Sequence, residues 1–172
     1  KRARLFSFAL YKMAWCQYKT GEVKPALQSL ERVIRAGRVA KGSQDQSAGG
    51  VSRIRLATEA QKDLVVFYAE AGTPQGARAY FEDIAGSKQV FGLLEKLAYY
   101  YADVGNREGA RFVFRDLITE KPNSPKAYDY QYQIVTMYFS TGSKDTFRNG
   151  LYNWIQNYSP NSEWAEANKK DK

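Results

Sequence analysis

The residue types that most often carry out catalysis are scarce in this sequence. There is no histidine, which removes the commonest general base and the commonest metal ligand in proteins. Cys16 is the single cysteine, so the chain can form no internal disulfide, no cysteine-based zinc site and no Cys–His nucleophile. We expect Cys16 to be a buried, unreactive thiol, with pairing to a cysteine elsewhere in a longer chain left open.

Other catalytic patterns are also missing. The segment GGVSR, residues 49–53, lacks the lysine and the spacing of a phosphate-binding P-loop. Aspartate and glutamate are scattered along the chain, and no two of them are singled out as a glycosidase-like pair. We therefore expect the carboxylates to be solvated charges on helix surfaces. The sequence predicts no enzyme activity, no metal site and no cofactor.

Three aromatic residues near the start of the chain have the spacing of one helical face. Tyr11, Trp15 and Tyr18 are separated by four and three residues, so on a helix they lie above one another. Exposed tyrosine and tryptophan are frequent anchors of protein interfaces. Two interpretations stay open: the three rings bind a partner, or they pack against a preceding structural repeat.

The composition favours a folded helical chain. Its 172 residues suit one compact domain or a short repeat array. Hydrophobic residues make up 44% and aromatic residues 15%, which is enough to build a core. No run approaches the ~18 apolar residues of a membrane span, and no signal peptide is visible. The chain begins with KRAR rather than methionine, so we expect a fragment of a longer protein.

The net charge of +8 is concentrated in the first third of the chain. Residues 1–62 carry 13 Lys/Arg and 4 Asp/Glu, whereas residues 63–172 carry 13 and 14. The sequence predicts a basic patch of Arg32, Arg35, Arg38, Arg53 and Arg55. A nucleic-acid-binding helical repeat is the alternative function that this patch indicates. No nucleic-acid module is recognised and the aromatics lie on other helix faces, so an acidic protein partner or solubility is favoured.

A pattern of large and small residues recurs around four glycines. Ala98 and Tyr101 lie seven and four residues before Gly105, and Ala110 and Phe114 lie five and nine after it. The same offsets appear around Gly21, Gly72 and Gly142. Apolar residues three and four apart predict a helix on each side of the glycine, and a glycine can end the first helix in a left-handed conformation. Each register therefore predicts a helical hairpin whose apolar face must stack on a neighbour.

Gly72 and Gly105 are 33 residues apart, and Gly105 and Gly142 are 37 apart. This helix–turn–helix period and residue pattern resemble the tetratricopeptide repeat (TPR) family. The resemblance implies an all-α, right-handed superhelical stack of about four hairpins with a short C-terminal capping helix, in one domain over residues 1–172. We expect repeats at 4–36, 54–87, 88–122 and 124–160, a flexible loop at 37–53 and a cap at 161–170. The loop accounts for the longer Gly21–Gly72 interval, because it is rich in glycine, serine and glutamine.

In the TPR family the first helix of each hairpin lines a concave surface that binds peptides. The matching positions of this sequence give the partner-binding candidates Tyr11, Trp15, Tyr18, Lys19, Lys62, Tyr99 and Tyr132. Some family members clamp a terminal carboxylate with lysine and asparagine, but Tyr11 and Trp15 occupy the corresponding places here. Lys19 and Lys62 favour acidic residues in the partner.

The resemblance implies a non-catalytic scaffold that binds a protein or peptide, with nucleic acid disfavoured as a partner. The segments FYAEAG, ARAYFEDI and LLEKLAYYYADVGN are also similar to long TPR proteins of bacterial cell-envelope and gliding-motility complexes. That similarity favours a periplasmic or cell-envelope location over a cytoplasmic one.

Overall fold

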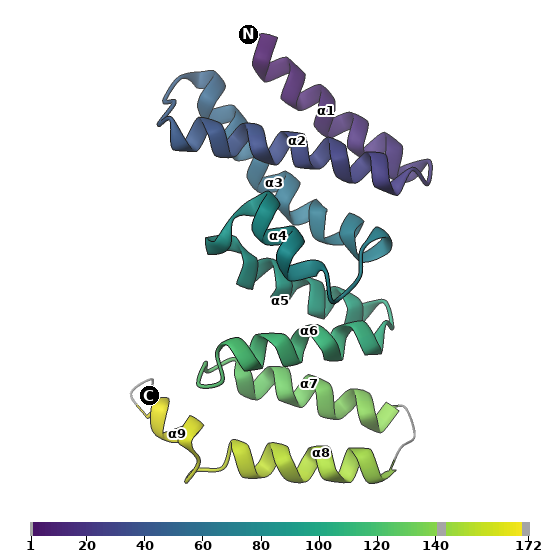
Figure 1. Ribbon diagram of the computed structural model, residues 1–172, viewed down its shortest axis with the longest axis vertical. Coiled ribbons are helices and arrows are strands. Elements are labelled where there is room, and N and C mark those ends of the chain that lie inside the picture. Colours follow the sequence, from purple (N-terminus) through teal and green to yellow (C-terminus); the bar gives the residue numbers. More distant parts are fainter. Residues whose placement is uncertain (1, 141–143, 170–172) are drawn as a thin grey trace. The chain divides into compact units, whose positions relative to one another are not determined.

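The computed structural model describes residues 2–140 and 144–169, with side chains from Leu5 onward. Within these residues the chain is all helical and contains no strand, so the predicted all-α helical-repeat fold is confirmed. Figure 1 labels the helices in chain order: α1 Arg2–Lys19, α2 Val23–Gly42, α3 Ala48–Ala71, α4 Ala77–Ala85, α5 Ser87–Asp103, α6 Arg107–Glu120, α7 Ala127–Ser140, α8 Lys144–Asn157 and α9 Glu163–Ala167. None of the described helices is long and apolar enough to cross a membrane.

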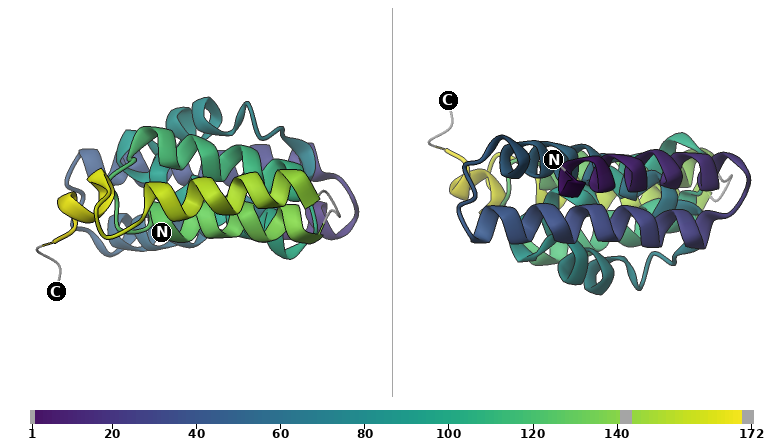
Figure 2. Two further views of the ribbon diagram at one scale, coloured as in Figure 1. Left: turned by 90° about the horizontal axis from the view of Figure 1, so that it is seen from below. Right: turned by 90° about the horizontal axis from the view of Figure 1, so that it is seen from above.

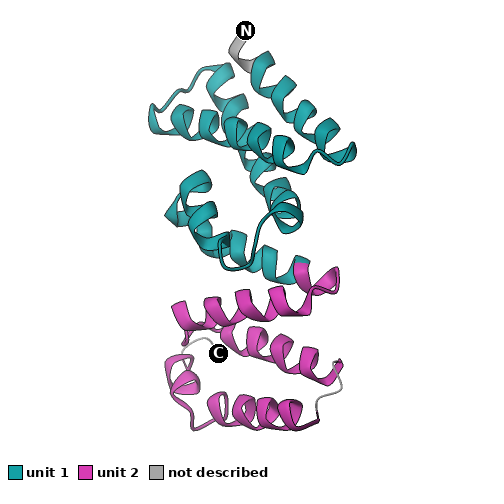
Figure 3. Ribbon diagram, turned by 45° about the vertical axis from the view of Figure 1, so that its right-hand side comes forward, with its two compact units in different colours: residues 1–100 teal, residues 101–172 magenta. Residues whose placement is uncertain are grey.

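The chain divides into two compact units, which Figure 3 colours separately. Unit 1 comprises residues 1–100 and unit 2 comprises residues 101–172. The boundary falls inside α5, so the first part of that helix belongs to unit 1 and its last turn to unit 2.

In unit 1, α1, α2 and α3 pack against one another, and α1 and α2 run side by side in Figure 2. The turn between α1 and α2 is built on Gly21, whose φ of 82° is the left-handed conformation expected for a hairpin glycine. Apolar side chains of α2 and α3 are fully buried, among them Leu30, Ile34, Leu64 and Phe67. Burial of such side chains is the main stabilising contribution to the unit.

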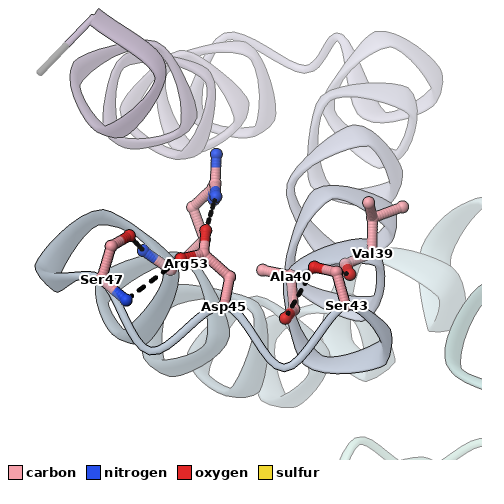
Figure 4. A network of polar contacts seen from close by, with 7 residues as sticks. Val39, Ala40, Ser43, Asp45, Ser47 and Arg53 are labelled. Carbon is pink, nitrogen blue, oxygen red and sulfur yellow. Dashed lines mark hydrogen bonds and ion pairs between the residues drawn. The ribbon is translucent and has the colours of Figure 1, made fainter.

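The predicted loop at 37–53 is wrong. Helix α2 continues to Gly42 and α3 begins at Ala48, so the connection is the short segment 43–47. Consequently the repeat boundaries expected at 36 and 54 fall inside helices. Figure 4 shows the polar contacts that order this turn. Asp45 accepts a hydrogen bond from the Ser47 amide at 3.0 Å and pairs with Arg53 at 2.5 Å.

The glycines of this segment permit close helix packing instead of making the chain flexible. A Cβ atom on Gly37 would lie 2.2 Å from the Ala57 Cβ and 2.9 Å from the Arg53 carbonyl oxygen. A Cβ on Gly50 would lie 2.2 Å from the Asp45 carbonyl oxygen. Only glycine fits these positions without displacing a neighbour, so α2 approaches α3 closely at Gly37 and the turn approaches α3 closely at Gly50.

The end of α4 is held by α2. Arg38 Nη1 donates hydrogen bonds to the carbonyl oxygens of Asp83 at 2.7 Å and Ile84 at 2.9 Å. These carbonyls belong to the last turn of a helix, where they lack intrahelical partners. Gly86 then leaves α4 with a φ of 89°. Gly72, by contrast, is extended rather than left-handed, so the hairpin glycine predicted there acts differently.

Two small residues expected at hairpin crossings, Ala77 in unit 1 and Ala110 in unit 2, are fully buried. Phe81 and Phe114, expected four residues later in each hairpin, are also fully buried. The turn before α6 contains Gly105 with a φ of 81°, as predicted. These positions therefore have the environments that the repeat pattern requires.

Unit 2 contains α6, α7 and α8 packed in sequence, followed by α9. None of the α8 residues is fully buried, and Phe147 lies half-buried with its ring 5.2 Å from that of Phe139. The predicted capping helix is present as α9, and its Trp164 donates a hydrogen bond to the Ser124 carbonyl at 2.7 Å. The predicted turn glycine Gly142 lies outside the described residues.

Candidate partner-binding surface

Helix α1 presents its predicted aromatic residues to α3. The Tyr11 hydroxyl donates to Asp63 Oδ2 at 2.6 Å, and Trp15 Nε1 donates to the same oxygen at 3.0 Å. Two turns further along, the Tyr18 hydroxyl donates to Glu70. Tyr11, Trp15 and Tyr18 are named the aromatic ladder below. Asp63 thus accepts hydrogen bonds from Tyr11 and Trp15, and Glu70 accepts one from Tyr18.

The rings of the ladder also make apolar contacts with α3. Tyr18 stacks on Phe67 with ring centroids 4.1 Å apart, and Trp15 meets the same ring edge-on at 5.2 Å. Phe67 is fully buried, while the ladder residues are half-buried. The ladder therefore packs against the following helix α3. Neither interpretation of the sequence included this contact with a following helix, and binding of a partner by the half-exposed rings stays a prediction.

The carboxylates of α3 change the acidity of the ladder tyrosines. Burial, and then the hydrogen bond to Asp63, raises the pKa of the Tyr11 hydroxyl. Burial, and then the Glu70 carboxylate, raises the pKa of Tyr18. Both factors disfavour the negatively charged phenolate, so the two hydroxyls are protonated hydrogen-bond donors at neutral pH.

A groove is lined by residues of α1 that precede the ladder in sequence. It has a volume of about 690 Å³ and lies between α1 and α3; we name it the apolar groove. Its apolar lining includes Leu5, Phe8 and Leu56, and its polar lining includes Arg53 and Arg55. Leu5 is 67% exposed and Phe8 is 52% exposed, so large apolar side chains face solvent here.

The other predicted binding residues lie in different settings. Lys19 is exposed, with its ammonium group 5.8 Å from the Trp15 ring centre. Lys62 pairs with Glu59 of its own helix at 2.9 Å. Tyr99 is half-buried on α5 in unit 1. Tyr132 belongs to unit 2, where its ring centroid lies 5.3 Å from that of Trp154. The structure thus brings five of the seven predicted binding residues together on α1 and α3, whereas Tyr99 and Tyr132 lie on other helices.

Most of the predicted basic patch is engaged within unit 1. Arg35 pairs with Asp83 at 2.6 Å, Arg38 caps α4, and Arg53 pairs with Asp45. Arg32 lies over the Phe6 ring at 5.5 Å. Arg55 is exposed and lines the apolar groove. Three of the five arginines therefore hold helices or turns in place.

Cys16 is exposed, so the expectation of a buried thiol is wrong. The described residues contain no group of three or more acidic, cysteine or histidine side chains that could hold a metal ion.

Sequence reasoning missed the acceptors of the ladder and the groove, although signals for both were present. Tyr11 and Tyr18 are seven residues apart, and so are Asp63 and Glu70. Equal spacings of donors and acceptors allow two facing helices to form both bonds at once, and the observed pairs Tyr11–Asp63 and Tyr18–Glu70 show that the two helices run in the same direction. Similarly, Phe8 and Leu5 extend the row from Tyr11 toward the N-terminus in two steps of three residues.

The comparison with protein families supports the repeat assignment. A tetratricopeptide repeat family model matches residues 8–36, which lie within the first predicted repeat and include the whole ladder. Together with the all-helical fold, this match supports a TPR protein. TPR repeats commonly mediate protein–protein interactions, and the family is typically non-catalytic. No curated protein and no solved structure matches the chain.

Proposed function

We propose that the chain is a non-catalytic protein-interaction scaffold whose apolar groove, with the aromatic ladder beside it, binds a segment of a partner protein. The observation that carries this proposal is the exposure of Leu5 and Phe8 along a groove of about 690 Å³. Contiguous exposed apolar surface of this kind commonly marks interaction sites. Phe8 of the groove is the first residue matched by the TPR family model, and members of that family commonly bind proteins.

A polar group in the groove lining supports the same proposal. Arg53 Nε is buried and has no hydrogen-bond partner among the described residues, although Arg53 Nη2 is paired with Asp45. A buried donor without an acceptor is energetically costly. A carbonyl oxygen of a bound peptide segment would supply the missing acceptor only after a shift of the Arg53 side chain, because Arg53 Nε is enclosed in this structure.

Binding of nucleic acid is the weaker alternative. Arg35, Arg38 and Arg53 are occupied by Asp83, by the end of α4 and by Asp45 respectively. A nucleic-acid surface needs cations that are available to several phosphates. The contacts of these three arginines therefore favour a protein partner.

The proposal includes a place in a bacterial envelope or motility complex, which rests solely on the similarity of FYAEAG and the neighbouring segments to proteins of such complexes. Fractionation of cells that express the natural gene tests this part. Recovery of the protein in the envelope fraction supports it, and recovery only in the cytosol contradicts it.

A display library of random peptides, selected against the wild-type protein, tests the binding function and does not require the natural partner. The affinity of the enriched peptides is then measured by calorimetry for the wild type and for Phe8→Ala. We expect Phe8→Ala to weaken binding by tenfold or more, because truncation of an anchor side chain commonly costs about 2 kcal/mol.

Val39→Ala is the matched control, because Val39 is 71% exposed on α2 and does not line the groove. It is expected to bind the selected peptides like the wild type. Equal affinity of Phe8→Ala and the wild type, or the absence of any enriched peptide, contradicts the proposal. Trp15→Ala is a poorer probe than Phe8→Ala, because Trp15 also holds α1 against α3.

A further inference from the structure

A second groove in unit 1 runs between α3 and α5. Two cavities, of about 500 and 230 Å³, share the lining residues Thr58, Gln61, Lys88 and Gln89 and are therefore continuous. We name their union the lysine groove. One end is lined by Arg38 and Lys41 of α2, and the other by Lys62 of α3 and Lys96 of α5.

All the charged residues that line the lysine groove are cationic. Its lining includes four lysines and one arginine but no aspartate or glutamate. Within the part of the chain that the structure describes, Lys41, Lys88 and Lys96 form no ion pair and are exposed. Lys62 has only the surface pair with Glu59. Like charges gathered without counter-charges attract an anion from solution.

A glycine in the floor of this groove has no role in packing. Gly92 lies inside α5, where glycine costs about 1 kcal/mol relative to alanine. A Cβ atom on Gly92 would lie more than 4 Å from every other heavy atom, except those of its two chain neighbours and the nearby backbone of its own helix. Thus nothing in unit 1 requires glycine at this position, in contrast to Gly37. The missing side chain leaves space in the groove instead.

We propose that the lysine groove binds an acidic, extended peptide segment. This inference goes beyond the proposed function, because it concerns a different groove and names the chemistry of its ligand. The ammonium groups would pair with glutamate or aspartate side chains, and the peptide backbone would pass over Gly92. Gln61 and Gln89 each offer one acceptor and two donors, which suit the carbonyl and amide groups of an extended backbone.

The spacing of the lysines fits such a segment. Lys88 and Lys96 are eight residues apart on one helix, which corresponds to about 12 Å. An extended peptide advances about 3.4 Å per residue, so acidic side chains about four residues apart reach both ammonium groups. Residues four apart in an extended chain also point to the same side.

The lack of aromatic residues in the lining of the lysine groove favours a peptide over a nucleic acid as its ligand. None of the residues lining the lysine groove is aromatic, whereas proteins that bind single strands combine cations with aromatic platforms for the bases. Phe67, which follows Lys62 on α3, is stacked on Tyr18 of α1 instead.

Fluorescence anisotropy at fixed, low ionic strength tests this inference with a labelled short peptide of alternating serine and glutamate. The same peptide with glutamine in place of glutamate is the ligand control. We expect the glutamate peptide alone to bind, and the double variant Lys88→Gln/Lys96→Gln to bind it about tenfold more weakly. The double variant Lys24→Gln/Lys144→Gln loses the same charge outside the groove, and it is expected to change the affinity less than twofold.

Gly92 supplies a second, independent test. Gly92→Glu adds a carboxylate to the groove, and Gly92→Gln adds a side chain of the same size without charge. Both changes favour the helix, because glycine is a poorer helix former than either residue. We expect the affinity for the glutamate peptide to fall from the wild type to Gly92→Gln and further to Gly92→Glu.

Several results would overturn the inference. If the Gly92→Glu variant bound the glutamate peptide as tightly as the wild type, the peptide would not lie in this groove. The same conclusion would follow if the two lysine double variants lost equal affinity. A single-stranded oligonucleotide of equal charge that binds more tightly, with the same dependence on Lys88 and Lys96, would assign the groove to nucleic acid. Phe8→Ala is expected to leave the binding of the glutamate peptide unchanged, so this test fails or succeeds separately from the proposed function.

Discussion

Helix α3 has two contrasting surroundings in unit 1. Toward α1, its carboxylates Asp63 and Glu70 accept hydrogen bonds from the aromatic ladder, and Phe67 packs on the same rings. Toward α5, it contributes Thr58, Gln61 and Lys62 to the lysine groove, which has no acidic residue. The first side joins two helices through internal contacts, whereas on the second side Lys62 has only an exposed ion pair with Glu59 of its own helix. The polar residues of α3 that face α1 thus stabilise the helix packing, whereas those that face α5 stay available to a ligand.

The largest loss of stability is expected at Gly37, where α2 packs closely against α3. Gly37→Ala places a methyl group where Ala57 and the Arg53 carbonyl already lie, and overpacking of this kind costs about 3 kcal/mol. Urea denaturation measures the change in the free energy of unfolding. Gly42→Ala is the control, because a Cβ there meets no atom within 4 Å. If both variants unfold at the same urea concentration, α2 and α3 do not approach each other as closely as described.

The next effect concerns the carboxylate shared by two rings. Asp63→Ala removes the acceptor of Tyr11 and Trp15, and hydrogen bonds to charged groups contribute about 2 kcal/mol each. Because both rings are half-exposed and water replaces part of the loss, we expect a total cost of about 2 kcal/mol and a lower melting temperature by circular dichroism. Glu59→Ala is the control, since Glu59 makes only a surface ion pair. An equal effect of the two substitutions would end the contrast between the two sides of α3.

A smaller effect and a pH dependence are expected for Tyr18. Tyr18→Phe removes one hydrogen bond to Glu70 and should cost about 1 kcal/mol at neutral pH. The pKa of Tyr18 is raised in the folded state, so its contribution is complete below the ordinary tyrosine pKa of about 10 and declines as the pH rises through the folded-state pKa.

The wild type should therefore lose stability above about pH 10, and Tyr18→Phe should lose less over the same range. Denaturation curves at a series of alkaline pH values measure this difference. Parallel pH profiles for the two proteins would show that Tyr18 does not donate to Glu70 in solution.

The smallest effect on stability is expected in the lysine groove. The exposed Lys88 and Lys96 have no ion-pair partner among the described residues, so Lys88→Gln/Lys96→Gln should change the free energy of unfolding by less than about 0.5 kcal/mol. Chemical denaturation of the double variant measures this value. A loss comparable with that of Asp63→Ala would mean that these lysines stabilise the fold, and the contrast would disappear.

The sequence predicted those features that depend on local spacing. Ala77, Phe81 and Gly105 follow from the repeat pattern, and each has the expected burial or backbone conformation. The common face of Tyr11, Trp15 and Tyr18 follows from helical geometry alone. Such features need only the chain within one or two turns of a residue, which is why a single sequence is sufficient for them.

Features that depend on a distant segment were not predicted correctly. The glycines at 37 and 50 indicate a flexible loop when read alone, but Ala57 and the Asp45 backbone give them their packing role. Likewise, nothing local to Lys88 or Lys96 shows that Lys41 and Lys62 line the same groove. These relations arise from tertiary contacts, which override local preferences.

The two hydrogen-bonded positions of the ladder limit how the gene can change in length. Tyr11 and Tyr18, like Asp63 and Glu70, are separated by seven residues, or about two helical turns. Deletion of one codon between Asp63 and Glu70 would rotate one carboxylate by about 100° relative to the other, so the two bonds could not both survive. A matching deletion between Tyr11 and Tyr18 would not restore the second bond, because at six residues the second side chain of each helix is turned about 120° away from the facing helix. Natural variants should therefore keep both intervals at seven residues, while the turn at 43–47 is not subject to this constraint.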